Sequence, residues 1–245
     1  MKQLIKISFA FIILSFAACK KNSTDVIAPG TTVPKLKTLT VMNGATVANT
    51  LTYEYDNAGR LIKITYLDGS KSTYTYTGST MLLEGFNANG ATQNKYTYNL
   101  NAYGAAVSYY GNATPAVVTN LTYNAANQAL TEITNTNGII NREQYYGYDN
   151  AGNRITDSLV QTTGTTIRTY EYYTDKISTL SNINFGDYYD GAGNPNSLKK
   201  ETAKSSGNVI TTVNFSIPEM DAQGRVIKQS YTTGGTTIDY LITYY

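Results

Sequence analysis

The chain has 245 residues, including 23 tyrosines and a single cysteine, and it contains no tryptophan and no histidine. Its formal charge of +2 comes from Lys2 and Lys6, which lie in a segment that we expect to be removed; the rest carries 17 basic and 17 acidic residues. This balance argues against nucleic acid as a partner, which calls for a basic patch. The lack of histidine excludes Ser-His-Asp triads, histidine metal sites and the usual general base.

Residues 1–18 predict a cleavable signal peptide. Two lysines make the start basic, and residues 7–18 are apolar except for Ser8 and Ser15. A run of this length suits the apolar core of a signal peptide, whereas a transmembrane helix requires roughly 20 apolar residues.

The end of this segment reads Phe-Ala-Ala-Cys and resembles the lipobox of bacterial lipoproteins. The resemblance implies cleavage before Cys19 and a diacylglycerol on its thiol, so that a membrane becomes a partner through the lipid. Lys20 and Lys21 stand where an aspartate would mark inner-membrane retention, which implies the outer membrane, on either of its faces. An ordinary secretory peptide cut after Ala18, leaving a free thiol, remains the alternative.

The remaining chain divides into a tether and one domain. Residues 19–35 are polar, contain Pro29, Gly30 and Pro34, and predict a flexible tether that carries the lipid on Cys19. Residues 36–245 predict a single repetitive β domain, because threonine and tyrosine favour strands while asparagine and glycine favour turns. Outside the signal peptide, no window shows convincing helical periodicity.

A repeated unit dominates that domain: a strand, a turn of the form Asp/Asn-x-x-Gly, and a second strand. The first turn residue accepts bonds from nearby backbone amides, and glycine at the fourth position takes the positive φ that closes the hairpin. Residues 86–90 are a further candidate copy. The predicted turn residues are Asp56 and Gly59, Asn101 and Gly104, Asn124 and Asn127, Asp149 and Gly152, Asp190 and Gly193, and Asp221 and Gly224.

The strands between these turns alternate in polarity. Residues 73–77 place tyrosine on one face and threonine on the other. In residues 238–244, isoleucine and tyrosine alternate at every second position and so share one face. A period of two indicates half-buried antiparallel strands. We therefore predict an all-β fold, an antiparallel meander of hairpins that curves strongly or closes into a barrel, because a flat sheet of this width would leave exposed edges.

Residues 53–61, Tyr-Glu-Tyr-Asp-Asn-Ala-Gly-Arg-Leu, resemble the YD (RHS-type) repeat, and residues 146–152 resemble it in part. Together with the lipobox, they are also similar to uncharacterised lipoprotein families of Gram-negative bacteria described as having a porin-like fold. The resemblance covers residues 36–245 and implies a wide antiparallel β-barrel or half-barrel. It carries no activity.

The search for chemistry yields no catalytic residue, no metal site and no cofactor. Residues 197–200 match Ser-x-x-Lys without its companion motifs, which we attribute to chance. Glu54 and Glu171 each lie between two tyrosines, which predicts a place on the solvent face. Residues 186–208 are the least apolar stretch of the domain; the alternatives are a functional loop and a solvated hairpin tip.

Exposed tyrosines are the remaining candidates for binding. Four Tyr-Tyr pairs place one ring on each face of a strand, and rings on an exposed face can stack on sugars or contact an apolar partner. The alternative is a set of cross-strand ladders that only hold the sheet together. The possible ligand-facing residues are Tyr109, Tyr145, Tyr172 and Tyr188.

The sequence favours a membrane-tethered, non-enzymatic β module that binds a glycan, a peptide or an envelope protein. Three alternatives remain: a carrier of an apolar ligand inside the curved sheet, a carboxylate-dependent hydrolase, and an integral outer-membrane barrel.

Overall fold

The structure, a computed structural model, describes residues 34–112, 114–205 and 210–245. The predicted signal peptide, Cys19 and most of the predicted tether lie outside these residues. The chain divides into two units, and the second, Val33–Tyr245, contains all the strands described below.

The strands of this unit follow one another along the chain with short connections. In order they are β1 (Leu36–Asn43), β2 (Thr46–Tyr55), β3 (Leu61–Tyr66), β4 (Lys71–Thr77), β5 (Thr80–Phe86), β6 (Thr92–Leu100), β7 (Ala106–Gly111), β8 (Thr114–Tyr123), β9 (Ala129–Thr136), β10 (Ile139–Tyr148), β11 (Arg154–Gln161), β12 (Gly164–Ile177), β13 (Asn196–Ser205), β14 (Ile210–Phe215), β15 (Glu219–Met220), β16 (Val226–Thr233) and β17 (Thr236–Tyr244). Between β12 and β13 lie a helical turn, α2 (Asn182–Phe185), and a 3-10 turn, η1 (Tyr188–Asp190).

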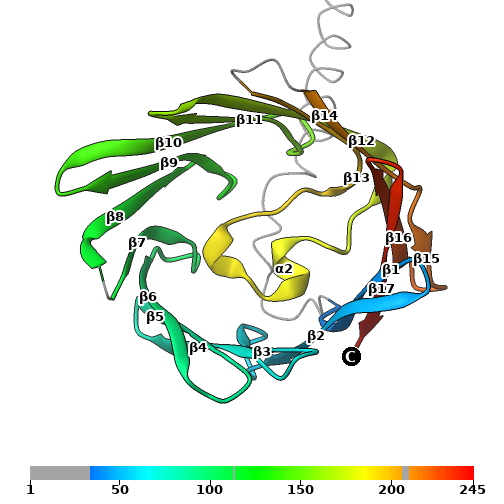
Figure 1. The fold of residues 1–245 in the computed structure, drawn as a ribbon, viewed down its shortest axis with the longest axis horizontal. Helices are drawn as coiled ribbons and strands as arrows, with labels where there is room; N and C mark the ends of the chain where they lie inside the picture. The colour runs from blue at the N-terminus through cyan, green and yellow to red at the C-terminus, as the bar shows by residue number, and fades with distance from the viewer. Residues whose placement is uncertain (1–33, 113, 206–209) are drawn as a thin grey trace, which may run out of the picture. The chain divides into compact units, whose positions relative to one another are not determined.

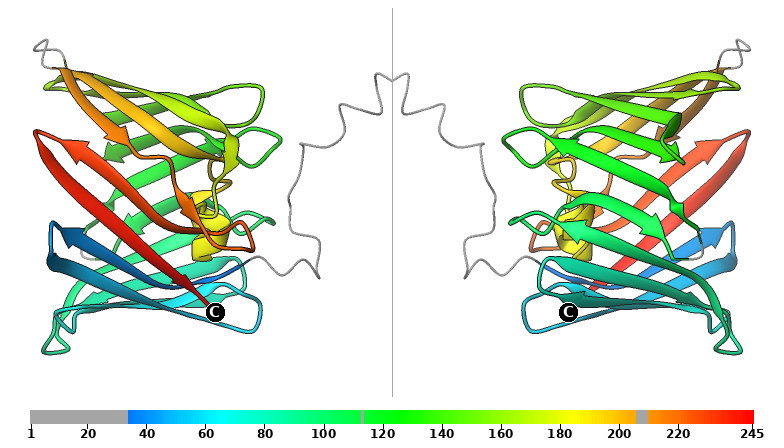
Figure 2. Two further views of the ribbon diagram at one scale, coloured as in Figure 1. Left: turned by 90° about the vertical axis from the view of Figure 1, so that its right-hand side faces the viewer. Right: turned by 90° about the vertical axis from the view of Figure 1, so that its left-hand side faces the viewer.

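The sheet closes into a barrel. Neighbouring strands pair antiparallel in chain order, and β1 pairs with β2 on one side and with β17 on the other, so the last strand returns to the first. β14 and β15 both pair with β16 and together occupy one place in the ring. Figure 1 shows the ring from one end and Figure 2 shows its tilted strands from the side. The predicted antiparallel meander is therefore confirmed in its closed form.

The turns of the repeat share one geometry. At residues 56–59, the amide of Gly59 donates to the carbonyl of Asp56 (2.9 Å), and the Asp56 carboxylate accepts from the amides of Ala58 and Arg60 (2.9 Å each). Gly59 has φ +74° and Asn127, at the same position of its turn, has φ +59°. The same bonds form in the turns that begin at Asn87, Asn101, Asn124, Asp149 and Asp221.

The predicted turn at Asp190 and Gly193 is wrong, because it is not part of a hairpin. Asp190 ends η1, and the residues on either side of it do not pair as strands. The amide of Ala192 instead donates to the carbonyl of Asn127 in another turn (2.8 Å). An added Cβ on Gly193 would lie 2.9 Å from the amide nitrogen of Asn182, so the segment folds back on itself.

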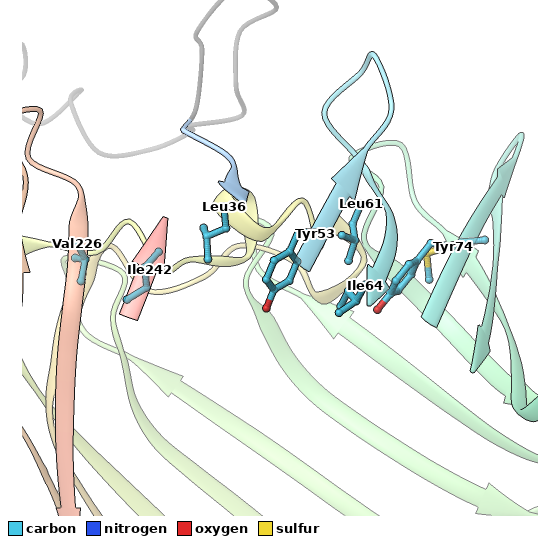
Figure 3. Packing of buried hydrophobic residues seen from close by; sticks show 8 residues of the cluster. Leu36, Tyr53, Leu61, Ile64, Tyr74, Val226 and Ile242 are labelled. Carbon is cyan, nitrogen blue, oxygen red and sulfur yellow. The ribbon is translucent and has the colours of Figure 1, made fainter. Parts of the chain in front are cut away.

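The apolar core lies where the wall of β1–β5, β16 and β17 meets the connection between β12 and β13. Side chains from these seven strands gather there, and Figure 3 shows how they pack. Leu180 and Phe185 of the connection pack against them. The buried core residues are Leu36, Tyr53, Leu61, Ile64, Tyr74, Met81, Val226 and Ile242.

The outer face carries cross-strand ion pairs and threonine pairs. Lys63 contacts Glu54 at 2.8 Å and Lys200 contacts Glu171 at 3.1 Å, and the two glutamate side chains are 46% and 55% exposed. The prediction that both glutamates lie on the solvent face is confirmed. None of the helices in the described part of the chain has the length and apolarity to cross a membrane.

Candidate binding site inside the barrel

Residues 178–195 enter the ring and form its internal segment, drawn in yellow in Figure 1. β1 begins and β17 stops at the same end of the barrel, which we call end A. The opposite end is called end B. In Figure 2 the segment lies toward the side where the chain ends, which is end A. Of the stretch predicted as a loop or solvated tip, residues 186–195 therefore lie inside the ring, residues 196–205 form β13, and residues 206–208 lie outside the described residues.

Aromatic rings hold the internal segment against the wall. Phe185 meets Tyr53 edge-on at 5.6 Å, and Tyr189 lies 6.0 Å from Tyr74 and 5.4 Å from Tyr98, centroid to centroid. Such aromatic pairs contribute beyond the area they bury.

Polar contacts attach the same segment to the wall at end A. The amide of Leu61 donates to the carbonyl of Gly186 (3.3 Å), and the amide of Arg154 donates to Asn194 Oδ1 (2.8 Å). An added Cβ at Gly186 would lie 2.8 Å from the nitrogen of Leu61, so the backbones approach as closely as glycine allows.

Opposite the apolar core, a row of charged and amide side chains crosses the inner face of β9–β13. Arg142 contacts Glu132 (2.5 Å) and also donates to Gln144, which in turn donates to both carboxylate oxygens of Asp157 (2.9 Å each). We call the row the inner band. It consists of Glu132, Arg142, Gln144, Asp157, Arg168 and Glu201.

Arg168 continues the inner band onto the next two strands. It lies 3.8 Å from Asp157 and 3.4 Å from Glu201. Arg142 and Arg168 lie near the starts of β10 and β12, and both strands begin at end B. The inner band therefore lies between the internal segment and end B.

Tyrosines flank the inner band on the same face. The hydroxyls of Tyr109 and Tyr146 donate to Glu132 (3.1 Å each), and that of Tyr170 donates to Asp157 (3.4 Å). Burial raises the pKa of Tyr170 to about 12, so its hydroxyl stays a donor at neutral pH. The Arg154 guanidinium lies over the rings of Tyr146 and Tyr170 at 5.3 and 5.2 Å.

Solvent reaches this inner face. The side chains of Arg142 and Arg168 are 31% and 33% exposed, that of Glu201 is 29% exposed, and that of Asp157 only 5%. Asp190 of the internal segment is exposed although the segment lies inside the ring. A ligand that entered through end B would therefore meet charged side chains that are held by hydrogen bonds or ion pairs and are still accessible.

Two pockets lie elsewhere in the described residues. One, of about 500 Å³, is lined by turn residues Asp56, Asn57 and Gly59 together with Lys35 and Tyr245. The other, of about 280 Å³, lies beside the turn at Asp68. The Asp56 and Asp68 carboxylates already bond the backbone of their own turns, and no group of three metal-ligating side chains occurs among the residues described.

The chain matches no protein-family model and no curated protein. Among solved structures it is similar to a porin-like protein from Bacteroides uniformis ATCC 8492, with a TM-score of 0.64 and 14% identity, over 86% of this chain and 98% of that one. The chain has a porin-like barrel fold. TcdB2-TccC3-Cdc42 and TcdB2-TccC3-TEV also match, with TM-scores of 0.31 and 0.26 and identities of 14% and 12%, over 80% and 78% of this chain and 10% of each of theirs.

The porin-like barrel does not bring the four candidate tyrosines together. Tyr109 and Tyr172 lie on the inner face, where Tyr109 stacks on Tyr98 at 5.0 Å and the Tyr172 hydroxyl donates to the carbonyl of Arg154 (2.7 Å). Tyr145 is 41% exposed and bonds Glu143. Tyr188 belongs to the internal segment, where its hydroxyl accepts from Lys35 (3.0 Å).

The charged residues of the inner band were not predicted from the sequence. A signal for them was present in the alternation, because Arg168 shares the face of Tyr170 and Tyr172 along one strand. An arginine in register with two inward tyrosines indicates a charge that points into the barrel.

Proposed function

We propose that this protein is a non-enzymatic binding module of the bacterial envelope that holds its ligand inside the barrel, against the inner band. The accessibility of hydrogen-bonded charges on an inner face carries this proposal. Side chains that are held in place by partners lose little freedom when a ligand binds, which favours affinity. A few oriented polar groups among aromatic rings are the usual lining of a ligand site.

The inner band argues against the apolar carrier. An apolar ligand would remove water from five charged groups without offering them hydrogen bonds, which is costly even for paired charges. The outer face argues against an integral barrel, because membrane barrels present an apolar band to lipid, whereas Lys63, Lys95 and Lys200 form ion pairs on the outer face here.

Two further elements of the proposal come from the sequence. The lack of histidine, with Cys19 as the only cysteine, supports a non-enzymatic role. The lipobox and the YD-like turns support an outer-membrane lipoprotein of the porin-like type, in which the lipid on Cys19 anchors the barrel through the tether.

Lipidation predicts a change of fraction when Cys19 is replaced. We expect the full chain, produced in a Gram-negative host, to enter the detergent phase on Triton X-114 partitioning. Cys19→Ser should move it to the aqueous phase, because a diacylglycerol supplies the apolar area that holds a protein in a bilayer. A Lys21→Ser control should stay with the detergent. Equal partitioning of both variants would contradict the anchor.

Binding inside the barrel predicts that inner and outer glutamates differ. We expect at least one compound in a panel of glycans, peptides and fatty acids to raise the melting temperature of the chain from residue 20 onward, in proportion to its concentration. Glu132→Gln, on the inner face, should abolish that shift. Glu171→Gln, the matched change on the outer face, should leave it intact. Loss with Glu171→Gln alone would move the site to the outer face, and no shift with any compound would contradict a small-ligand site.

A further inference from the structure

The chemistry of the inner band narrows the class of ligand. Resting on the proposed function, we propose that the inner band binds a neutral oligosaccharide that enters through end B. The sugar hydroxyls bond the charged side chains, and the apolar faces of the sugar rings lie against Tyr109, Tyr146 and Tyr170.

Charge compensation favours a ligand without charge. Along the inner band an acid alternates with a base, since Arg142 pairs with Glu132, and Arg168 lies between Asp157 and Glu201. Each base of the inner band is already paired with an acid, so a charged ligand must compete with existing ion pairs and gains little.

Hydroxyl groups suit these side chains because a hydroxyl both donates and accepts. A guanidinium has five N–H donors and a carboxylate has about four acceptor positions. Arg168 meets its partners at 3.4 and 3.8 Å, distances that are long for hydrogen bonds, so its N–H groups retain capacity. A sugar hydroxyl beside an arginine and a carboxylate can accept from the one and donate to the other without breaking the ion pair.

The tyrosines supply the apolar part of the same surface. Their hydroxyls donate to Glu132 and Asp157, which fixes each ring beside the charges. A pyranose ring carries a face of C–H groups edged by hydroxyls, so a ring next to a charge matches it. Because the rings come from β7, β10 and β12, they extend across several strands and fit a chain of sugars rather than a single one.

The internal segment disfavours anionic ligands. Asp190 is exposed inside the ring, and the charge of Glu132 acts on it. With Asp190, the acids around the inner band are Glu132, Asp157, Glu201 and Asp190, against the bases Arg142, Arg154 and Arg168. This excess of acid repels uronic acids and other anionic chains.

Isothermal titration of the chain from residue 20 onward tests the class of ligand. The neutral probes are maltohexaose, cellohexaose and xylohexaose, and the others are hexagalacturonate, palmitate and tetralysine. We expect at least one neutral hexasaccharide to bind and the other three probes not to. Arg168→Gln and Tyr146→Leu should each weaken that binding about ten-fold, as expected for the loss of one charged hydrogen bond or one stacked ring. Lys200→Gln, on the outer face of β13, is the matched control.

The outcomes separate this inference from the proposed function. One outcome is that only hexagalacturonate, palmitate or tetralysine binds and that Arg168→Gln weakens this binding. It would overturn the proposal of a neutral oligosaccharide and leave a site inside the barrel. Saccharide binding that only Lys200→Gln weakens would overturn both. No binding by any neutral hexasaccharide would overturn the saccharide. Melting curves establish that each variant is folded, and Tyr146→Leu keeps the test valid where Arg168→Gln loses its fold.

Discussion

Replacing Phe185 by alanine is expected to lower the free energy of unfolding by about 3 kcal/mol, the lower end of the range for loss of a core aromatic ring. The lower end applies because Phe185 is partly rather than fully buried. Its ring meets Tyr53, which is 3% exposed, edge-on at 5.6 Å. The alanine variant loses that contact and leaves a cavity where the internal segment meets the wall of β1–β5.

Urea unfolding followed by tyrosine fluorescence measures this effect, and Tyr103→Ala is the control. Tyr103 is 61% exposed in the turn between β6 and β7, so its removal should change stability by less than about 0.5 kcal/mol. Equal midpoints for the two variants would show that the internal segment does not stabilise the barrel. A lower slope for Phe185→Ala would show that the segment leaves the interior while the wall stays folded.

The expected cost follows from how a wide ring obtains a core. Small barrels fill their interior with side chains, whereas wide barrels leave a water-filled channel or hold a plug in the lumen. Among the described residues, the fully buried apolar side chains larger than alanine lie on one side of the ring, where the internal segment packs against them; they are Leu36, Leu61, Met81 and Val226. The segment therefore supplies apolar contacts that the wall alone cannot provide.

The turns and the alternation were predictable because both are local. An asparagine or aspartate that accepts two amides within four residues needs no distant partner, and five of the six predicted turns have that geometry, as at Asp56 and Asp221. The sequence left two outcomes open, a strongly curved sheet and a closed barrel. Closure depends on the pairing of β1 with β17, which lie at opposite ends of the domain sequence. Sequence alone gives no pairing between such distant strands.

The internal segment and the inner band were not predicted for the same reason. Residues 178–195 contain few apolar side chains, and these have no regular spacing. Asp190 and Gly193 also match the turn of the repeat. Only the surrounding ring keeps the segment inside. Glu132 and Glu201 lie on different strands, β9 and β13, and only the register of the sheet places both in one row. A single charge in a strand reads as a solvent-facing residue unless the interior is known to be accessible.

The stability of the barrel is expected to fall as pH rises from 6 to 8, because of Asp187. Desolvation in the internal segment raises the pKa of this carboxyl to about 8, and one carboxyl oxygen is buried without a hydrogen-bond partner among the described residues. The native state therefore holds a proton that the unfolded chain has released above its ordinary pKa of 3.8. Unfolding free energy then declines with pH by at most about 1.4 kcal/mol per unit until the folded pKa is passed.

Because the sequence has no histidine, few other groups titrate between pH 6 and 8. No ordinary side chain of the sequence titrates between pH 6 and 8. Asp190 is exposed to the interior of the ring, where partial desolvation by the surrounding wall raises the pKa of its carboxyl to about 6, so most of its contribution is lost below the window. Burial lowers the pKa of Lys35 from 10.5 to about 8, which makes its contribution rise with pH only above the window.

Asp187→Asn should remove the decline between pH 6 and 8 and make the variant about 2 kcal/mol more stable than the parent at pH 8, since the amide needs no proton to stay neutral. Urea unfolding at half-unit steps of pH measures both effects. Asp175→Asn, at an exposed carboxyl, should keep the parent's slope. A parent curve that is flat from pH 6 to 8 would mean that water or a cation reaches Asp187, and that the interior is wetter at the internal segment than its packing indicates. Retention of the slope in Asp187→Asn would assign the proton to another group inside the ring.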